Sequence, residues 1–134
     1  MTTTEGLQAG PQRGFGPHVH VVFVTKYRRG VLHAEHLDLL EDVFTTICSD
    51  FGATLLEGNG EDDHVHLLVE YPPTVAISGL VNSLKGVSSR RLRQRFEIRT
   101  HQDHLWSPSY LAASAGGAPL SIIRQYVQAQ RRPV

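Results

Sequence analysis

The sequence predicts an α+β fold in which an antiparallel sheet carries helices on one face. The chain has 134 residues, a length typical of a single domain. Apolar residues alternate in some segments and recur at helical spacing in others, which predicts the order β-α-β-β-α-β and then a terminal helix. This order is the ferredoxin-like plan, and it leaves the other face of the sheet free to bind a ligand.

The first predicted strand follows a segment that has few apolar side chains for a core to bury. Residues 1–17 are rich in glycine and proline, so we expect a flexible leader before a domain that spans 18–134. β-branched and aromatic residues predict a strand over 18–27. Apolar residues spaced three and four apart then predict a helix over 34–50.

The middle of the chain has the pattern of a β-hairpin. We expect strands over 53–57 and 64–71, the second of which is bounded by two prolines. The segment Gly58-Asn59-Gly60 lies between them and predicts the turn, because glycine and asparagine tolerate positive φ.

The last elements are a helix, a strand and a second helix. Thr74 can cap the first of these helices, whose apolar positions keep to one broad face. Residues 104–114 predict a strand, and Pro108 places it at an edge or a bulge. Gly116-Gly117 predicts a turn before a terminal helix over 119–130.

Charge is distributed unevenly along a chain whose formal net charge is zero. Residues 35–70 hold ten acidic residues and no lysine or arginine, whereas residues 85–99 hold six basic residues and one acidic residue. A neutral protein with this pattern can present one positive face to nucleic acid, although a solvated helix face has the same pattern.

Other features exclude whole classes of protein. The single cysteine, Cys48, rules out an internal disulfide and a cysteine-based zinc cluster. No apolar run is long enough to cross a membrane, and the first ten residues do not resemble a secretory signal. We therefore expect a cytoplasmic protein without a membrane partner.

The tripeptide His-Val-His occurs twice, at 18–20 and at 64–66. Side chains two apart on a strand point to the same side, so each pair of histidines can share a metal ion. In a ferredoxin-like sheet the two strands are neighbours, so one pair can bind the metal while a member of the other supports it. His20 and Asp63 are candidates for that supporting role. For the first tripeptide, a hydrogen-bonded scaffold is the simpler interpretation.

The terminal helix carries a second constellation. Tyr126 and Gln130 are four residues apart and share a helix face beside the apolar stripe. The amide oxygen can be a third metal ligand, and the phenol can attack an electrophile that the metal holds. The alternative is a tyrosine at the core edge with its hydroxyl in water.

Several short motifs occur in a fixed order along the chain. The central one is His64-Val65-His66, two histidines separated by a hydrophobic residue. The others are Thr25-Lys26-Tyr27-Arg28-Arg29, Ser83-Leu84-Lys85-Gly86-Val87-Ser88-Ser89-Arg90, Leu105-Trp106-Ser107-Pro108-Ser109-Tyr110, Gly116-Gly117-Ala118-Pro119 and Tyr126-Val127-Gln128-Ala129-Gln130. From about residue 20 to 130 the chain resembles the single-tyrosine HUH transposases of small insertion sequences.

The resemblance implies a function and a site. Members of this family cut and rejoin single-stranded DNA at insertion-sequence ends, recognise DNA hairpins and work as homodimers with active sites shared between subunits. It implies that Tyr126 is the nucleophile that forms a 5′-phosphotyrosine. It also implies that His64, His66 and Gln130 hold a divalent metal, Mg²⁺ or Mn²⁺.

The basic residues are the candidates for contacts with DNA phosphates. They are Lys26, Arg28, Arg29, Lys85, Arg90 and Arg91. Trp106 and Tyr110 can stack on unpaired bases, but a place in the sheet or dimer core is the favoured interpretation.

Three other functions stay open at this point. A domesticated relative would nick chromosomal repeat hairpins by the same chemistry, and a non-catalytic module would bind single strands without metal or Tyr126. A phosphoesterase that uses both His-Val-His tripeptides would leave Tyr126 idle.

Overall fold

The predicted element order is confirmed. The computed structural model describes residues 16–98, 104–114 and 120–130. Its elements are β1 (His18–Val24), the 3₁₀ turn η2 (Lys26–Arg28), α1 (Ala34–Asp50), β2 (Thr54–Gly60), β3 (His64–Glu70), α2 (Ile77–Arg95), β4 (Leu111–Ser114) and α3 (Leu120–Ala129). The four strands pair antiparallel in the order β2-β3-β1-β4, which is the ferredoxin-like arrangement.

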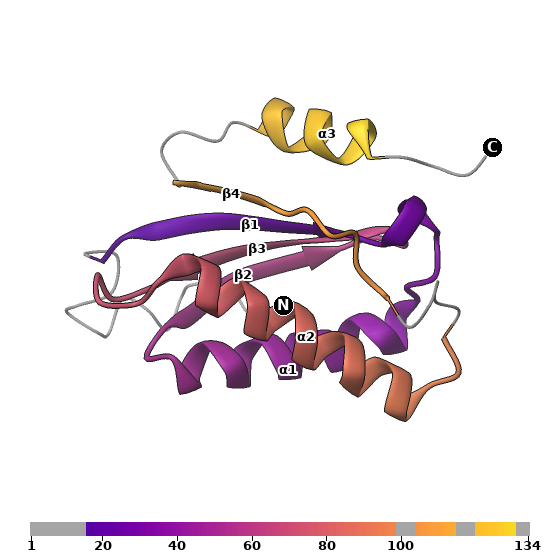
Figure 1. Ribbon diagram of the computed structural model, residues 1–134, viewed down its shortest axis with the longest axis horizontal. Helices are drawn as coiled ribbons and strands as arrows, with labels where there is room; N and C mark the ends of the chain where they lie inside the picture. Colours follow the sequence, from indigo (N-terminus) through magenta and orange to yellow (C-terminus); the bar gives the residue numbers. More distant parts are fainter. Residues whose placement is uncertain (1–15, 99–103, 115–119, 131–134) are drawn as a thin grey trace.

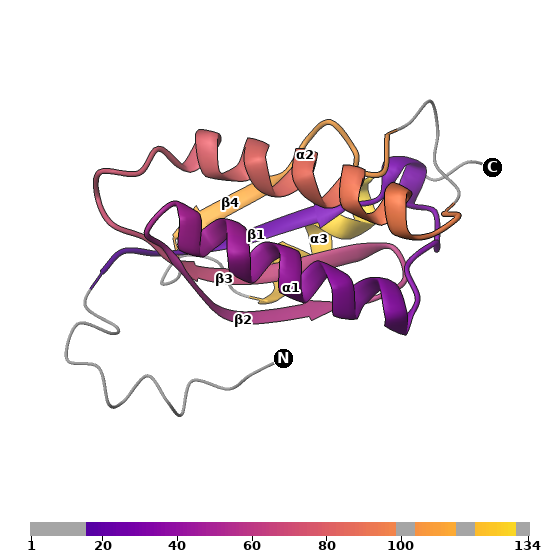
Figure 2. The same ribbon diagram turned by 90° about the horizontal axis from the view of Figure 1, so that it is seen from below.

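Helices cover both faces of the sheet. Figure 1 shows α1 and α2 together on one face and α3 on the other. Figure 2 shows α1 and α2 side by side across their face. The expectation of a free second face is therefore wrong in part, because α3 lies over some of it.

The main core lies between the sheet and the α1–α2 layer. Phe23 of β1 points into it and contacts the rings of Phe44 at 6.1 Å and Trp106 at 5.6 Å between centroids. The indole N–H of Trp106 donates to Ser88 Oγ at 2.9 Å, so its polar atom is satisfied in the interior. This burial confirms that Trp106 is a core residue.

A smaller core holds α3 against the opposite face. Val22 and Val24 of β1 are fully buried there against Ile123 and Val127 of α3. Because side chains alternate along a strand, β1 supplies both cores from successive residues. This packing fixes the rotation of α3 about its own axis, and therefore which of its other side chains point toward the sheet.

Two element ends differ from the prediction. β1 stops at Val24, because Tyr27 and Arg28 adopt positive φ angles of 59° and 55° and turn the chain. β2 continues to Gly60 instead of turning at 58–60. A Cβ at Gly60 would lie 2.6 Å from Leu37 Cδ2, so glycine here permits close approach to α1.

Later elements also depart from expectation. α2 begins at Ile77 without a side-chain cap, and Thr74 lies in the preceding turn. Before β4, residues 104–110 form no continuous strand, although Trp106 bridges to Thr25, so the last strand is short. Residues 1–15, the predicted turn at 116–117 and residue 119 lie outside the described residues. No described helix is long and apolar enough to span a membrane.

Cys48 gives a test of the main core. The residue is fully buried, and burial raises the pKa of its thiol to about 12. Because the thiolate is the reactive form, we expect the native protein to resist a thiol reagent at about pH 8. Unfolding in guanidinium should release one reactive thiol per chain, measured by absorbance or mass. Rapid labelling of the native protein would contradict this packing.

Candidate active site

The two histidines of β3 lie on the sheet face that carries α3. His64 and His66 are both half-buried, and the pairing with β1 sets them opposite Val24 and Val22. Those valines belong to the small core under α3, so the imidazoles lie at its border. The strand thus presents both rings to one side, as the spacing predicted.

Asp63 fixes the orientation of His64. Its Oδ1 lies 2.8 Å from Nδ1 of His64, and its Oδ2 accepts from Nε of Arg28 at 3.1 Å. Arg28 also donates to the carbonyl of Gln128 on α3 at 3.4 Å. If Nδ1 of His64 donates its proton to this carboxylate, Nε2 is left with the lone pair that a metal needs. The carboxylate of Glu61 lies 3.7 Å from that Nε2.

His20 holds the second imidazole. Its Nδ1 lies 2.8 Å from Nε2 of His66, with ring centroids 4.9 Å apart. Burial lowers the pKa of His66, and the nearby His20 and His64 lower it further. A neutral imidazole is the form that binds metals. His18 contacts Glu70 at 3.1 Å, so both histidines of the first tripeptide act as a hydrogen-bonded scaffold.

The turn after β1 brings Arg28 to this site. Thr25 Oγ1 donates to the carbonyls of Arg29 at 2.7 Å and Asp63 at 3.1 Å, which closes the turn against the start of β3. Tyr27 and Arg28 are both left-handed, a conformation that costs free energy for residues other than glycine. The turn therefore holds a strained backbone where it directs the guanidinium of Arg28 to Asp63.

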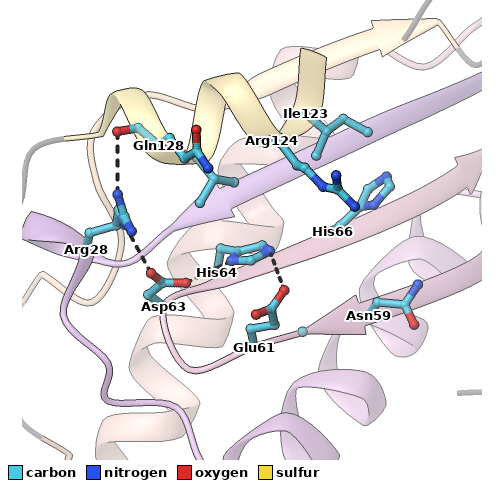
Figure 3. A pocket seen from close by; sticks show the side chains of 11 residues that line it. Arg28, Asn59, Glu61, Asp63, His64, His66, Ile123, Arg124 and Gln128 are labelled. Atoms are coloured by element: carbon cyan, nitrogen blue, oxygen red, sulfur yellow. Dashed lines mark hydrogen bonds and ion pairs between the residues drawn. The ribbon is translucent and has the colours of Figure 1, made fainter. Parts of the chain in front are cut away.

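A pocket of about 400 Å³ opens over the two histidines. Figure 3 shows its walls, with β2 and β3 on one side and α3 on the other. The lining residues are Arg28, Asn59, Gly60, Glu61, Asp63, His64, His66, Ile123, Arg124, Val127 and Gln128. The residues predicted for the site did not include Asn59, Glu61, Arg124 or Gln128. The β2–β3 pairing sets Asn59 opposite His66, but the position of α3 depends on tertiary packing.

Tyr126 lies on another side of α3, and Gln130 directly follows the last residue of that helix. The hydroxyl of Tyr126 is 2.9 Å from Ser109 Oγ, and Gln130 Oε1 accepts from Ser107 at 3.2 Å and from Ser109 at 3.3 Å. Burial raises the pKa of Tyr126, while the Ser109 hydrogen bond opposes that shift. Both side chains reach Ser109, as their spacing suggested, but α3 ends at Ala129, so the prediction of a helix to residue 130 is one residue too long. Within one chain, however, they do not line the histidine pocket.

The candidate phosphate-binding residues separate into two groups. Arg28 lines the histidine pocket, and Lys26 and Arg29 flank it in the same turn, whereas Arg90 and Arg91 are on α2, across the sheet (Figure 1). One bound phosphate cannot reach both groups.

Lys85 is engaged inside the protein. Its Nζ donates to the carbonyl oxygens of Ser107, Pro108 and Ser109 at 2.7, 3.1 and 3.5 Å. Burial lowers the pKa of this ammonium group. Its contacts therefore hold the segment that receives Tyr126 and Gln130.

Comparison with known proteins identifies the family. Residues 15–130 match the family model described as "Transposase IS200 like". The chain belongs to the IS200-like transposases. This membership confirms the resemblance seen in the motifs.

Individual relatives of this IS200-like transposase cover most of its length. The ISDra2 transposase TnpA of Deinococcus radiodurans is 32% identical over 114 residues, which cover 83% of this chain and 81% of that protein. The transposase for insertion sequence element IS200 of Salmonella typhimurium is 29% identical over 100 residues, covering 72% and 66% respectively.

Solved structures show the same architecture. A crystal structure of a protein assigned as a transposase of D. radiodurans R1 aligns with a TM-score of 0.79 at 32% identity, covering 87% of this chain and 92% of that one. A REP-associated tyrosine transposase bound to a REP hairpin aligns with a TM-score of 0.59, covering 86% and 64%. The latter is 13% identical, so its likeness concerns the fold.

The histidine pair fits a divalent metal but does not complete a site alone. Asp63 directs one nitrogen of His64 outward, and the lowered pKa of His66 favours its neutral form. Within the described ranges, no three His, Cys, Asp or Glu side chains are grouped closely enough to hold a metal.

Replacing Lys85 tests its structural role. Lys85→Met leaves three carbonyls without their donor, so we expect the free energy of unfolding to fall by about 1–2 kcal/mol. Denaturant unfolding followed by Trp106 fluorescence measures the change. Arg91→Met on the exposed side of the same helix is the control and should change stability by less than about 0.5 kcal/mol. Equal effects of the two variants would exclude the carbonyl clamp as a stabilising feature.

Proposed function

We propose that this chain cleaves and rejoins single-stranded DNA at insertion-sequence ends through a metal-assisted 5′-phosphotyrosine. The observation that carries the proposal is the oriented pair His64 and His66, which opens on a pocket in a chain of the IS200-like family. Tyr126 lies on α3, the helix that forms the other wall, and Gln130 directly follows that helix. The proposed enzyme is therefore a metal-dependent tyrosine transposase.

In this proposal His64, His66 and Gln130 bind the metal, Mg²⁺ or Mn²⁺. When bound, the metal would withdraw charge from the scissile phosphate and orient it for in-line attack. Asp63 and His20 hold the two imidazoles in place before the ligand arrives. Gln130 would supply the oxygen that the histidine pair lacks.

Tyr126 would act as the nucleophile. Its phenol oxygen bonds to phosphorus while the bond from phosphorus to the 3′ oxygen breaks, and the phenol proton ends on the released 3′-hydroxyl. Because burial raises the pKa of Tyr126, the phenol is neutral near pH 7 and needs an activated phosphate. One phosphodiester replaces another, so the step is reversible and needs no ATP.

A homodimer would bring Tyr126 and Gln130 close to a histidine pair. In the single chain Tyr126 contacts Ser109, next to β4, and β4 ends the strand order of the described sheet. An edge strand offers backbone groups to a second copy. We therefore propose that Tyr126 and Gln130 of one subunit serve the histidine pair of its partner.

The DNA substrate is proposed to carry hairpins near the insertion-sequence ends. The basic turn with Lys26, Arg28 and Arg29 lies beside the pocket and would contact the strand that enters it. Arg90 and Arg91, on the other side of the sheet, would contact a different part of the DNA.

A covalent-adduct assay tests the chemistry. The protein is incubated with hairpin-bearing single-stranded DNA and Mg²⁺, then resolved on a denaturing gel. We expect an adduct that is lost in Tyr126→Phe, strongly reduced in His64→Ala and His66→Ala, and lost with EDTA. The Tyr126→Phe substitution retains the aromatic ring but removes the nucleophilic hydroxyl. Tight binding without any adduct would instead indicate a non-catalytic single-strand binder, and the proposal would fail.

Mixed dimers test the sharing of sites. Tyr126→Phe and His64→Ala chains are each inactive in this proposal. A dimer with one of each keeps one complete site if the tyrosine acts in the partner. We expect about half the wild-type adduct from purified mixed dimers, because one of two sites survives. No adduct from the mixed dimer, with wild-type controls active, would show that both groups act within one chain.

A further inference from the structure

Arg124 is the cationic side chain that α3 contributes to the histidine pocket of its own chain. It is exposed and lines the pocket with His64 and His66. Figure 3 shows its side chain extending from α3 toward His66. Among the described residues the structure records no hydrogen bond or ion pair of Arg124.

The other charged groups of the pocket already have partners. Arg28 is bonded to Asp63 and to the carbonyl of Gln128, and Asp63 is also bonded to His64. Glu61 lies 3.7 Å from His64, with a side chain that is 75% exposed. Arg124 is thus a pocket cation whose guanidinium has no recorded partner among the described residues, so all of its donors are available to a ligand.

The geometry of α3 separates Arg124 from Tyr126. Residues two apart on a helix point about 200° apart, on opposite sides of its axis. The structure agrees, because Arg124 lines the histidine pocket while the Tyr126 hydroxyl contacts Ser109. Ile123 and Val127 hold the helix on Val22 and Val24 between these two sides.

We propose that α3 serves two active sites: Arg124 binds a DNA phosphate at its own chain's histidine pair, while Tyr126 reacts at the partner's. This inference rests on the proposed function and adds a phosphate-binding residue to it. A guanidinium presents a planar fork of donors that matches two phosphate oxygens. At this position it would orient the scissile phosphate and stabilise the charge that develops on it.

Mixed dimers show whether Arg124 acts at its own chain's histidine pair or at the site where its own tyrosine reacts. The same two substitutions are placed in two different arrangements. In the first, Arg124→Gln is on one subunit and Tyr126→Phe is on the other. In the second, both substitutions are on one subunit and its partner is wild type. The reference is a dimer of one Tyr126→Phe chain and one wild-type chain, which keeps a single complete site.

The intact tyrosine of each mixed dimer acts at the site of the Tyr126→Phe chain. In the first arrangement that site keeps its own Arg124, so we expect adduct formation at the reference rate. In the second arrangement that site lacks Arg124, so we expect a rate lower by about a hundredfold. The reverse result would assign Arg124 to the same site as its own tyrosine. Equal rates, or slowing in both, would also overturn the proposal.

Binding gives a readout that does not need catalysis. In a Tyr126→Phe background, Arg124→Gln should weaken binding of single-stranded DNA and lower its salt dependence by about one phosphate contact, while Arg124→Lys restores part of both. Gln125→Ala, exposed on the same helix, is the control and should change neither. Unchanged binding in Arg124→Gln would overturn the phosphate contact. If the wild-type protein forms no adduct but Arg124→Gln weakens DNA binding, the proposed phosphotyrosine chemistry is wrong, whereas the contact between Arg124 and a DNA phosphate is supported.

Discussion

The antiparallel register between β1 and β3 is the constraint on which the rest of the molecule depends. It sets Val22 opposite His66 and Val24 opposite His64. The same register brings His20 within 2.8 Å of His66. A shift by one residue would turn every side chain of a strand to the other face. The imidazoles would then enter the main core, so the packing that stabilises the sheet also keeps the site exposed.

A network of hydrogen bonds then turns this sheet face into an organised pocket. The left-handed turn after β1 directs Arg28 to Asp63, and Asp63 orients His64. Arg28 also reaches the backbone of Gln128, so the network connects the turn to α3. Oriented side chains bind a metal or a phosphate with less loss of conformational freedom. The cost is the strained backbone at Tyr27 and Arg28.

The terminal helix has three functional sides. Ile123 and Val127 pack on the sheet, Arg124 faces the histidine pocket, and Tyr126 faces the segment that Lys85 clamps. Ten residues of helix therefore contact two separate surfaces of the same chain. In the proposed dimer this division allows one helix to contribute to two sites.

The sequence by itself determined the element order, the fold class and the pairing of His64 with His66 on one side of a strand. Alternation and helical spacing are local properties, so they can be read without knowing the neighbours. The spacing of Tyr126 and Gln130 likewise predicted that the two side chains lie close together, and both reach Ser109 although α3 ends at Ala129. Motifs in a fixed order were sufficient to indicate the family.

Only the tertiary structure decided how these parts meet. Gly58-Asn59-Gly60 has the composition of a turn, yet it belongs to β2 because it pairs with β3, and Gly60 lies against Leu37 of α1. Lys85 has the composition of a phosphate ligand, yet three carbonyls surround its ammonium group. The rotation of α3, which sends Arg124 and not Tyr126 to the pocket, follows from burial of Ile123 and Val127 on β1. These outcomes depend on contacts between residues far apart in the chain, and a local pattern does not encode them.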